Sequence, residues 1–114
     1  MATLVSVARL YGRSERGDLT HDELATGFDD LNSELLALTQ LRMRLGPVGT
    51  RLLNEAVNAF MESLEALQGQ MVGIVREPAS GDAQAFLPTS WGRRLDQAGA
   101  ALDRVVIAAT ASFS

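Results

Sequence analysis

The sequence of 114 residues predicts an all-α fold, a helical bundle built on a long antiparallel helical hairpin. Three segments carry an apolar repeat in which spacings of three and four residues alternate, and this spacing gathers the apolar side chains on one face of a helix. Stretches that contain glycine and proline separate these segments. Hydrophobic residues make up 46% of the chain and aromatic residues only 5%. We therefore expect a single helical domain, residues 1–114, with an aliphatic core.

The first arm of the predicted hairpin spans about residues 20–45. Thr20 is a suitable N-cap, and Glu23 can reach back to the Thr20 N–H, which completes a capping box. Leu19 before the cap and Leu24 after it can pack on each other as a hydrophobic staple. The apolar repeat of this arm consists of Leu24, Phe28, Leu31, Leu35, Leu38 and Leu45.

The second arm spans about residues 50–76 and carries the most regular repeat, in which spacings of four and three alternate without a break. Such a repeat, sustained over three heptads, is typical of the seam of a coiled coil or a helical bundle. The repeat consists of Leu53, Val57, Phe60, Leu64, Leu67, Met71 and Ile74. The side chains that we expect to carry the packing are Leu53, Phe60, Leu64, Leu67 and Met71.

The second arm also carries a stripe of small residues away from its leucine seam, formed by Ala59, Ala66, Gly69 and Gly73. Each glycine inside a helix costs roughly 1 kcal/mol relative to alanine, so two of them call for a reason. Small side chains allow another helix backbone to approach closely. We therefore predict close contact at Gly69 and Gly73, against either the third helix or another subunit.

Gly46, Pro47 and Gly49 separate the two arms, because proline removes a backbone donor and clashes with the preceding turn. The short connection favours antiparallel neighbours. A loop over residues 77–89 then leads to a third helix at about residues 90–112, with Ser90 or Thr89 as its N-cap. The repeat of this helix consists of Leu95, Gly99, Leu102, Val106, Ala109 and Phe113.

The N-terminal residues 1–19 form a short helix or an extended arm. Leu4, Val7 and Tyr11 fit one face of a helix that ends at Gly12, whereas Val5 and Val7 also fit an extended strand. The helix is the preferred interpretation, and the sequence leaves the arm open as the alternative.

The composition excludes several kinds of chemistry. Cysteine is absent, which rules out disulfides, zinc–thiolate sites and thiol catalysis. The 10 basic residues are all arginine, so no lysine can form a Schiff base or hold a phosphate loop. The net charge of −4 disfavours a nucleic-acid partner. We expect no enzymatic activity, no cofactor and no metal site.

Nothing in the sequence predicts a membrane span, because no run of about 18 apolar residues occurs. No secretory signal pattern frames the first residues either. We therefore expect a cytoplasmic protein.

His21 is the chain's one histidine and would be the first residue of the first arm, facing water. The segment "HDEL", followed by a leucine-rich helix, resembles the phosphoacceptor segment of one class of sensor histidine kinases. In that family a two-helix hairpin carries the phosphorylated histidine, and an acid follows it directly, as Asp22 follows His21 here. The resemblance implies a phosphotransfer or dimerisation module that uses His21. The competing interpretation is an exposed residue of the capping segment.

Surplus apolar residues favour an interaction protein. Leu36, Leu41 and Met43 lie off the seam of the first arm, and the tail "VVIAATASF" is largely apolar. Large exposed apolar patches usually mark interfaces. We expect a non-enzymatic assembly or adaptor subunit that forms a homo-oligomer and can bind another protein. A third hypothesis is a ligand-sensing bundle in which Trp91 and Phe86 line a pocket.

Overall fold

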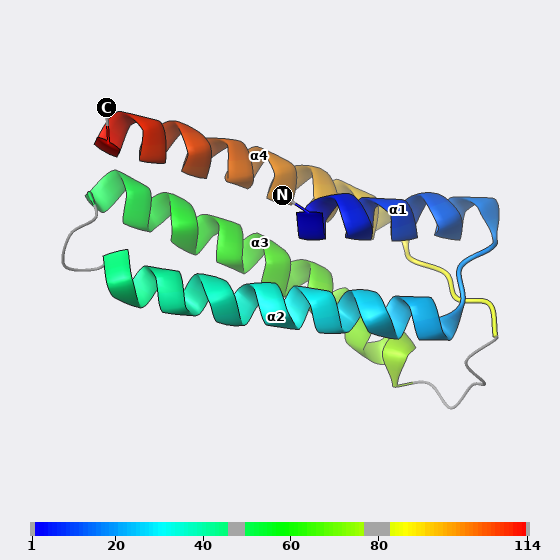
Figure 1. Cartoon of the computed structure of the whole chain (residues 1–114). Coiled ribbons are helices and arrows are strands. Elements are labelled where there is room, and N and C mark those ends of the chain that lie inside the picture. The colour runs from blue at the N-terminus through cyan, green and yellow to red at the C-terminus, as the bar shows by residue number, and fades with distance from the viewer. Residues whose placement is uncertain (1, 46–49, 77–82, 114) are drawn as a thin grey trace.

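The structure, a computed structural model, describes residues 2–45, 50–76 and 83–113. Over these residues the chain forms four helices, α1 (Ala2–Arg16), α2 (His21–Leu45), α3 (Arg51–Val75) and α4 (Thr89–Phe113). They pack lengthwise into a bundle of 48 × 22 × 19 Å (Figure 1). The predicted all-α bundle is confirmed, and the three predicted long helices lie within a residue or so of their expected bounds.

Helix α3 lies between α2 and α4 and packs against both of them, whereas α1 bridges α2 and α4 over one half of the bundle (Figure 1). Helices α2 and α3 run antiparallel, as predicted for the hairpin. Polar side chains join the pair, because Arg42 Nη1 donates to Asn58 Oδ1 at 3.0 Å and Gln68 Nε2 donates to Asn32 Oδ1 at 3.4 Å. Gly46, Pro47 and Gly49, which were expected to separate the arms, lie outside the described residues.

The leucine seams of α2 and α3 form most of the core. In α2, alternate members of the repeat are buried, namely Leu24, Leu31 and Leu38, and Phe28, Leu35 and Leu45 pack against the core from its edge. Helix α3 begins where Thr50 caps it, since the Thr50 hydroxyl accepts from Leu53 N at 3.2 Å. The buried members of the α3 repeat are Leu53, Val57, Phe60, Leu64, Leu67 and Met71.

The prediction for α4 is confirmed in part for its face and is wrong about its cap. Leu95, Leu102 and Ala109 of the expected seam pack against the core from its edge, whereas Val106 is 56% exposed. The fully buried residues of α4 are Trp91, Ala98, Ala101 and Ala108. The helix turns its alanine side inward because small side chains let it lie close to α3. It also begins at Thr89, so neither Thr89 nor Ser90 precedes the helix as an N-cap. The Ser90 hydroxyl instead accepts a hydrogen bond from Gln70 Nε2 at 3.0 Å.

The N-terminal segment is a helix, and its predicted end at Gly12 is wrong. Helix α1 continues through Gly12 to Arg16 and ends at Gly17, whose φ of 77° lies in the left-handed region that favours glycine. Gly17 N donates to Ser14 O at 3.1 Å, and Asp18 N donates to Arg13 O at 3.0 Å. These two bonds are the pattern of a Schellman motif, which satisfies the last carbonyls of the helix.

Candidate functional site

Helix α1 covers only part of the length of the bundle that the other three helices form. It has 15 residues, against 25 in each of its neighbours (Figure 1). Two glycines allow its close approach. A Cβ on Gly27 of α2 would collide with the Leu10 side chain, and a Cβ on Gly92 of α4 would lie 2.6 Å from Tyr11 Cζ. Sequence reasoning missed both glycines, because neither interrupts a repeat.

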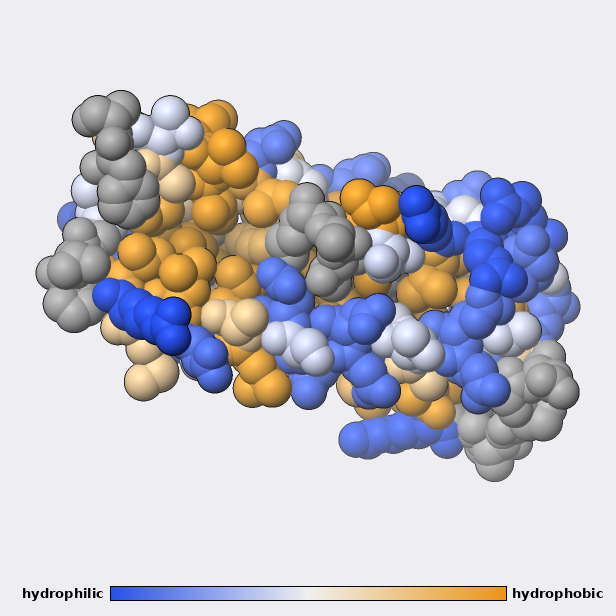
Figure 2. Space-filling view, viewed as in Figure 1, coloured by the Kyte–Doolittle hydropathy of each residue, from blue (hydrophilic) through white to orange (hydrophobic). Residues whose placement is uncertain are grey.

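The uncovered half of the bundle exposes apolar side chains on α2, α3 and α4. Leu41 and Val106 lie fourteen residues beyond Gly27 and Gly92, on the same sides of α2 and α4, where α1 no longer covers them. Figure 2 shows apolar surface gathered at this end of the molecule, while the opposite end is mostly hydrophilic. We call this surface the apolar end, and its large side chains are 40–73% exposed: Leu36, Leu41, Met43, Leu52, Val106 and Ile107.

An open groove between α3 and α4 belongs to the apolar end. Its volume is about 330 Å³. Glu55 and Arg104 provide the charged groups of its lining. The apolar lining consists of Leu52, Ala56, Ala59, Ile107 and Ala108. Such a groove can accept an apolar side chain, and burying apolar area stabilises a complex by about 25 cal/mol per Å².

The residues predicted for packing fall into two groups. The five large side chains are all buried in the core of the single chain: Leu53, Phe60, Leu64, Leu67 and Met71. Gly69 and Gly73 are exposed, and among the described residues a Cβ on either one would meet nothing within 4 Å beyond the adjacent backbone of α3. The predicted close approach of α4 at these glycines therefore does not occur, and among the predicted contacts only one with another subunit remains open for them.

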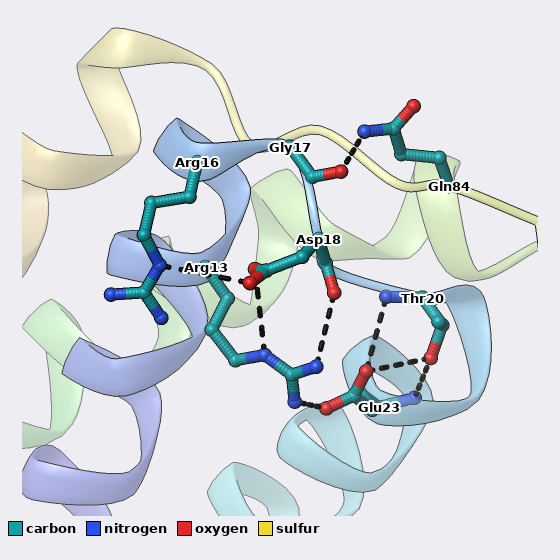
Figure 3. Close-up of polar contacts among 7 residues, drawn as sticks. All are labelled: Arg13, Arg16, Gly17, Asp18, Thr20, Glu23 and Gln84. Atoms are coloured by element: carbon teal, nitrogen blue, oxygen red, sulfur yellow. Dashed lines mark hydrogen bonds and ion pairs between the residues drawn. The ribbon is translucent and has the colours of Figure 1, made fainter.

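His21 begins α2 at the hydrophilic end of the molecule, as expected from the capping box. Thr20 N and Thr20 Oγ1 both donate to Glu23 Oε1, at 3.4 and 3.0 Å, and Glu23 N donates to Thr20 Oγ1 at 3.3 Å (Figure 3). The backbone N–H of His21 donates to Ala83 O at 2.9 Å, beside an isolated β-bridge between Thr20 and Gln84. The His21 side chain is partly exposed.

An ion-pair cluster next to His21 joins α1 to α2. Arg13 Nη1 pairs with the Glu23 carboxylate, and Arg13 Nε lies 3.6 Å from Asp18 Oδ1 (Figure 3). Arg16 Nε lies 3.7 Å from Asp18 Oδ2, and Gln84 donates to the Gly17 carbonyl. Each carboxylate of the cluster lies beside an arginine, so the cluster has a structural role and links the end of α1 to the start of α2.

The aromatic pair of the ligand-sensing hypothesis does not line a common pocket. Trp91 is fully buried, its Nε1 donates to Leu67 O at 3.1 Å, and its ring stacks on Tyr11. Phe86 is 59% exposed on the segment before α4. Partial burial raises the pKa of the Tyr11 phenol, and the carboxylates of Glu15 and Asp96 raise it further.

The described residues contain no group of three side chains placed to hold a metal ion. None of the helices in this part of the chain is long and apolar enough to cross a membrane. Comparisons of the chain with protein-family models, with curated proteins and with solved structures gave no match. The apolar end is therefore the feature of the described structure on which a functional hypothesis can be built.

Proposed function

We propose that the chain is a non-enzymatic assembly or adaptor subunit that acts through protein–protein contacts of its apolar end, in a cytoplasmic homo-oligomer. The observation that carries the proposal is the distribution of exposed apolar side chains. The exposed large apolar side chains of the described residues concentrate on the half of the bundle that α1 leaves uncovered, and two others, Val5 and Phe86, lie elsewhere. Contiguous apolar surface of this kind typically marks an interface.

The direct test is the mass in solution, measured by light scattering from about 1 μM to about 1 mM, the range in which weak and moderate self-association is detected. The proposal predicts a mass above that of one chain, rising with concentration. A mass of one chain over the whole range contradicts the homo-oligomer.

Matched glutamate substitutions locate the contact. Ile107→Glu alters the apolar end, whereas Phe86→Glu alters a side chain of similar exposure, 66% against 59%, outside it. We expect the first to weaken association at least tenfold, or about 1.4 kcal/mol, because it places a charge in apolar surroundings. The second leaves association unchanged. Equal effects of the two variants would mean that self-association does not depend on the apolar end.

The same assay distinguishes the phosphotransfer alternative. His21→Ala leaves mass and helix content unchanged under the assembly proposal, because His21 is the first residue of α2 and this end of α2 lies opposite the apolar end (Figure 1). Stable phosphate incorporation from a phosphodonor, abolished by His21→Ala, would favour the phosphotransfer module instead.

A further inference from the structure

The exposed side chains of the apolar end point to several sides of the bundle. Val106 and Ile107 are adjacent in α4 and more than half exposed, so they point about 100° apart around that helix. Leu41 and Met43 are two residues apart in α2 and point to nearly opposite sides of it. Leu52 of α3 lines the same groove as Ile107. Apolar surface therefore lies on several sides of this end and does not form one flat face.

These side chains lie close to the end of the bundle at which α2 ends and α3 begins (Figure 1). At about 1.5 Å of rise per residue, Leu41 lies about 6 Å from the last residue of α2, and Ile107 lies about 9 Å from the last residue of α4. Leu52 is the second residue of α3. Amphipathic helices on membrane surfaces bury their apolar side chains to a similar depth, about 5–10 Å, at the boundary between headgroups and acyl chains.

The same end carries positive charge, although the whole chain has a net charge of −4. Residues 105–113 contain no charged residue. Residues 41–55 contain three arginines and one acid, a net charge of +2: Arg42, Arg44, Arg51 and Glu55. The three arginines are exposed, and the acid lies 2.9 Å from the Arg51 Nε. Arginine side chains can lay their apolar stems along apolar surface while the guanidinium group stays in a polar layer.

We infer that the apolar end binds the surface of an anionic lipid membrane, into which it inserts end first. The guanidinium groups of Arg42, Arg44 and Arg51 contact the anionic headgroups, and the apolar side chains reach the boundary with the acyl chains. The inference goes beyond the proposed function, because it gives the apolar end a second partner besides another copy of this chain.

Shape and charge together favour a lipid surface over a single protein face. A flat partner face covers one side of the end, so it would leave either Val106 or Ile107 in water. The interfacial layer of a membrane is fluid and encloses an inserted group on all sides. Anionic headgroups also attract arginines, and each arginine near the surface strengthens binding about fivefold.

Co-sedimentation with vesicles measures the binding. At about 0.1 M salt, we expect vesicles with about one third phosphatidylglycerol in phosphatidylcholine to bind the chain at least tenfold more tightly than phosphatidylcholine alone. A triple variant, Arg42→Gln with Arg44→Gln and Arg51→Gln, is expected to lose at least tenfold in binding of the anionic vesicles. The matched control changes the same charge in three exposed arginines outside the apolar end: Arg9→Gln, Arg93→Gln and Arg94→Gln. Its binding is expected to stay within about twofold of the wild type, because salt screens distant charges.

Serine substitutions test whether the membrane encloses the end. Val106→Ser and Ile107→Ser alter different sides of α4, and each is expected to weaken vesicle binding about fivefold to tenfold, because less apolar area is buried. Val5→Ser alters a side chain outside the apolar end, 52% exposed against 56% for Val106, and leaves binding unchanged. Circular dichroism verifies that each variant keeps its helix content. A loss in only one of the two α4 variants would indicate a one-sided contact and overturn the insertion of the end.

The vesicle assay and the mass in solution give separate outcomes for the inference and for the proposed function. Binding of anionic vesicles that the triple variant and both α4 variants weaken, and that the controls leave unchanged, supports the inference. A chain that self-associates but binds no vesicles overturns the inference, leaves the proposed function standing and makes a second copy the occupant of the apolar end. Vesicle binding by a chain that remains single in solution supports the inference and contradicts the homo-oligomer. Equal binding of both kinds of vesicle overturns the role of the arginines and with it the inference.

Discussion

The ring of Tyr11 stacks on the ring of Trp91, with the ring centroids 5.8 Å apart and the planes inclined by 27°. The contact joins α1 to α4, and the hydrogen bond from Trp91 Nε1 to Leu67 O extends the connection to α3. An aromatic pair of this kind contributes about 0.5–1.5 kcal/mol beyond its buried area. It is therefore a principal anchor of the short helix on the bundle.

Gly92→Ala is expected to lower the free energy of unfolding by about 1–3 kcal/mol, because the new methyl group would overlap the Tyr11 ring. Gly99→Ala is the control on the same helix, where a Cβ meets nothing within 4 Å. Replacing Gly99 is expected to raise stability by up to about 1 kcal/mol through helix propensity. Urea unfolding of both variants measures the difference, and equal stabilities would contradict the close seat of α1 on α4.

Ser14→Ala is expected to destabilise the protein by about 1–3 kcal/mol. The buried Ser14 hydroxyl accepts from Leu87 N at 2.7 Å, so its removal leaves a buried N–H without its acceptor. Thr110→Ala removes an exposed hydroxyl that donates to Val106 O at 2.9 Å, and its effect is within about 0.5 kcal/mol. Urea unfolding of the two variants provides the comparison, and a Ser14→Ala protein as stable as the wild type would exclude the structural role of this bond.

The Tyr11 phenol is expected to titrate above its ordinary value of 10.0, and Glu15→Gln is expected to bring its pKa closer to that value. Because the native state holds this proton more tightly than the unfolded chain, the free energy of unfolding falls as the pH rises above 10.0. Tyr11 is the chain's single tyrosine, so phenolate absorbance reports it alone. Glu62→Gln is the control, and an unshifted titration in Glu15→Gln would refute the assignment.

Gly69→Ala and Gly73→Ala are each expected to stabilise the chain by up to about 1 kcal/mol, because alanine favours the helix and the added methyl groups meet no described atom within 4 Å beyond the adjacent backbone of α3. Thermal unfolding measures the gain, and mass measurement shows whether association survives. Weaker association of these more stable variants would assign the small-residue stripe to a contact between subunits. Unchanged association would mean that the small-residue stripe makes no contact between subunits and only lowers the stability of α3.

Local patterns in the sequence were sufficient for the helices and for two of their faces. The buried face of α3 follows from the sequence alone, because residues spaced three and four apart lie on one side of a helix. The start of α2 was equally local, because Thr20 and Glu23 are neighbours that bind each other's backbone and side chain. Both features depend on residues within a few turns of one another.

The features that the sequence did not reveal depend on distant partners. The end of α1 depends on contacts with distant residues. Stacking of Tyr11 on Trp91 is one such contact, and it stabilises the helix beyond Gly12 as far as Gly17. Most of the buried residues of α4 are alanines, and hydrophobicity alone ranks Val106 above them. The repeat therefore predicts Val106 in the seam, whereas packing against α3 buries Ala101 and Ala108 instead.

The seating of α1 has a consequence for synthesis on the ribosome. Helix α1 leaves the exit tunnel before the other three helices, whereas its partner Trp91 lies on α4, the last of them. Until α4 has been translated, the inward side of the nascent helix has no complete binding site, and Val7 and Tyr11 remain in contact with water. Helix α1 is therefore made before the helices that it packs against and is one of the last of the described elements to reach its final place.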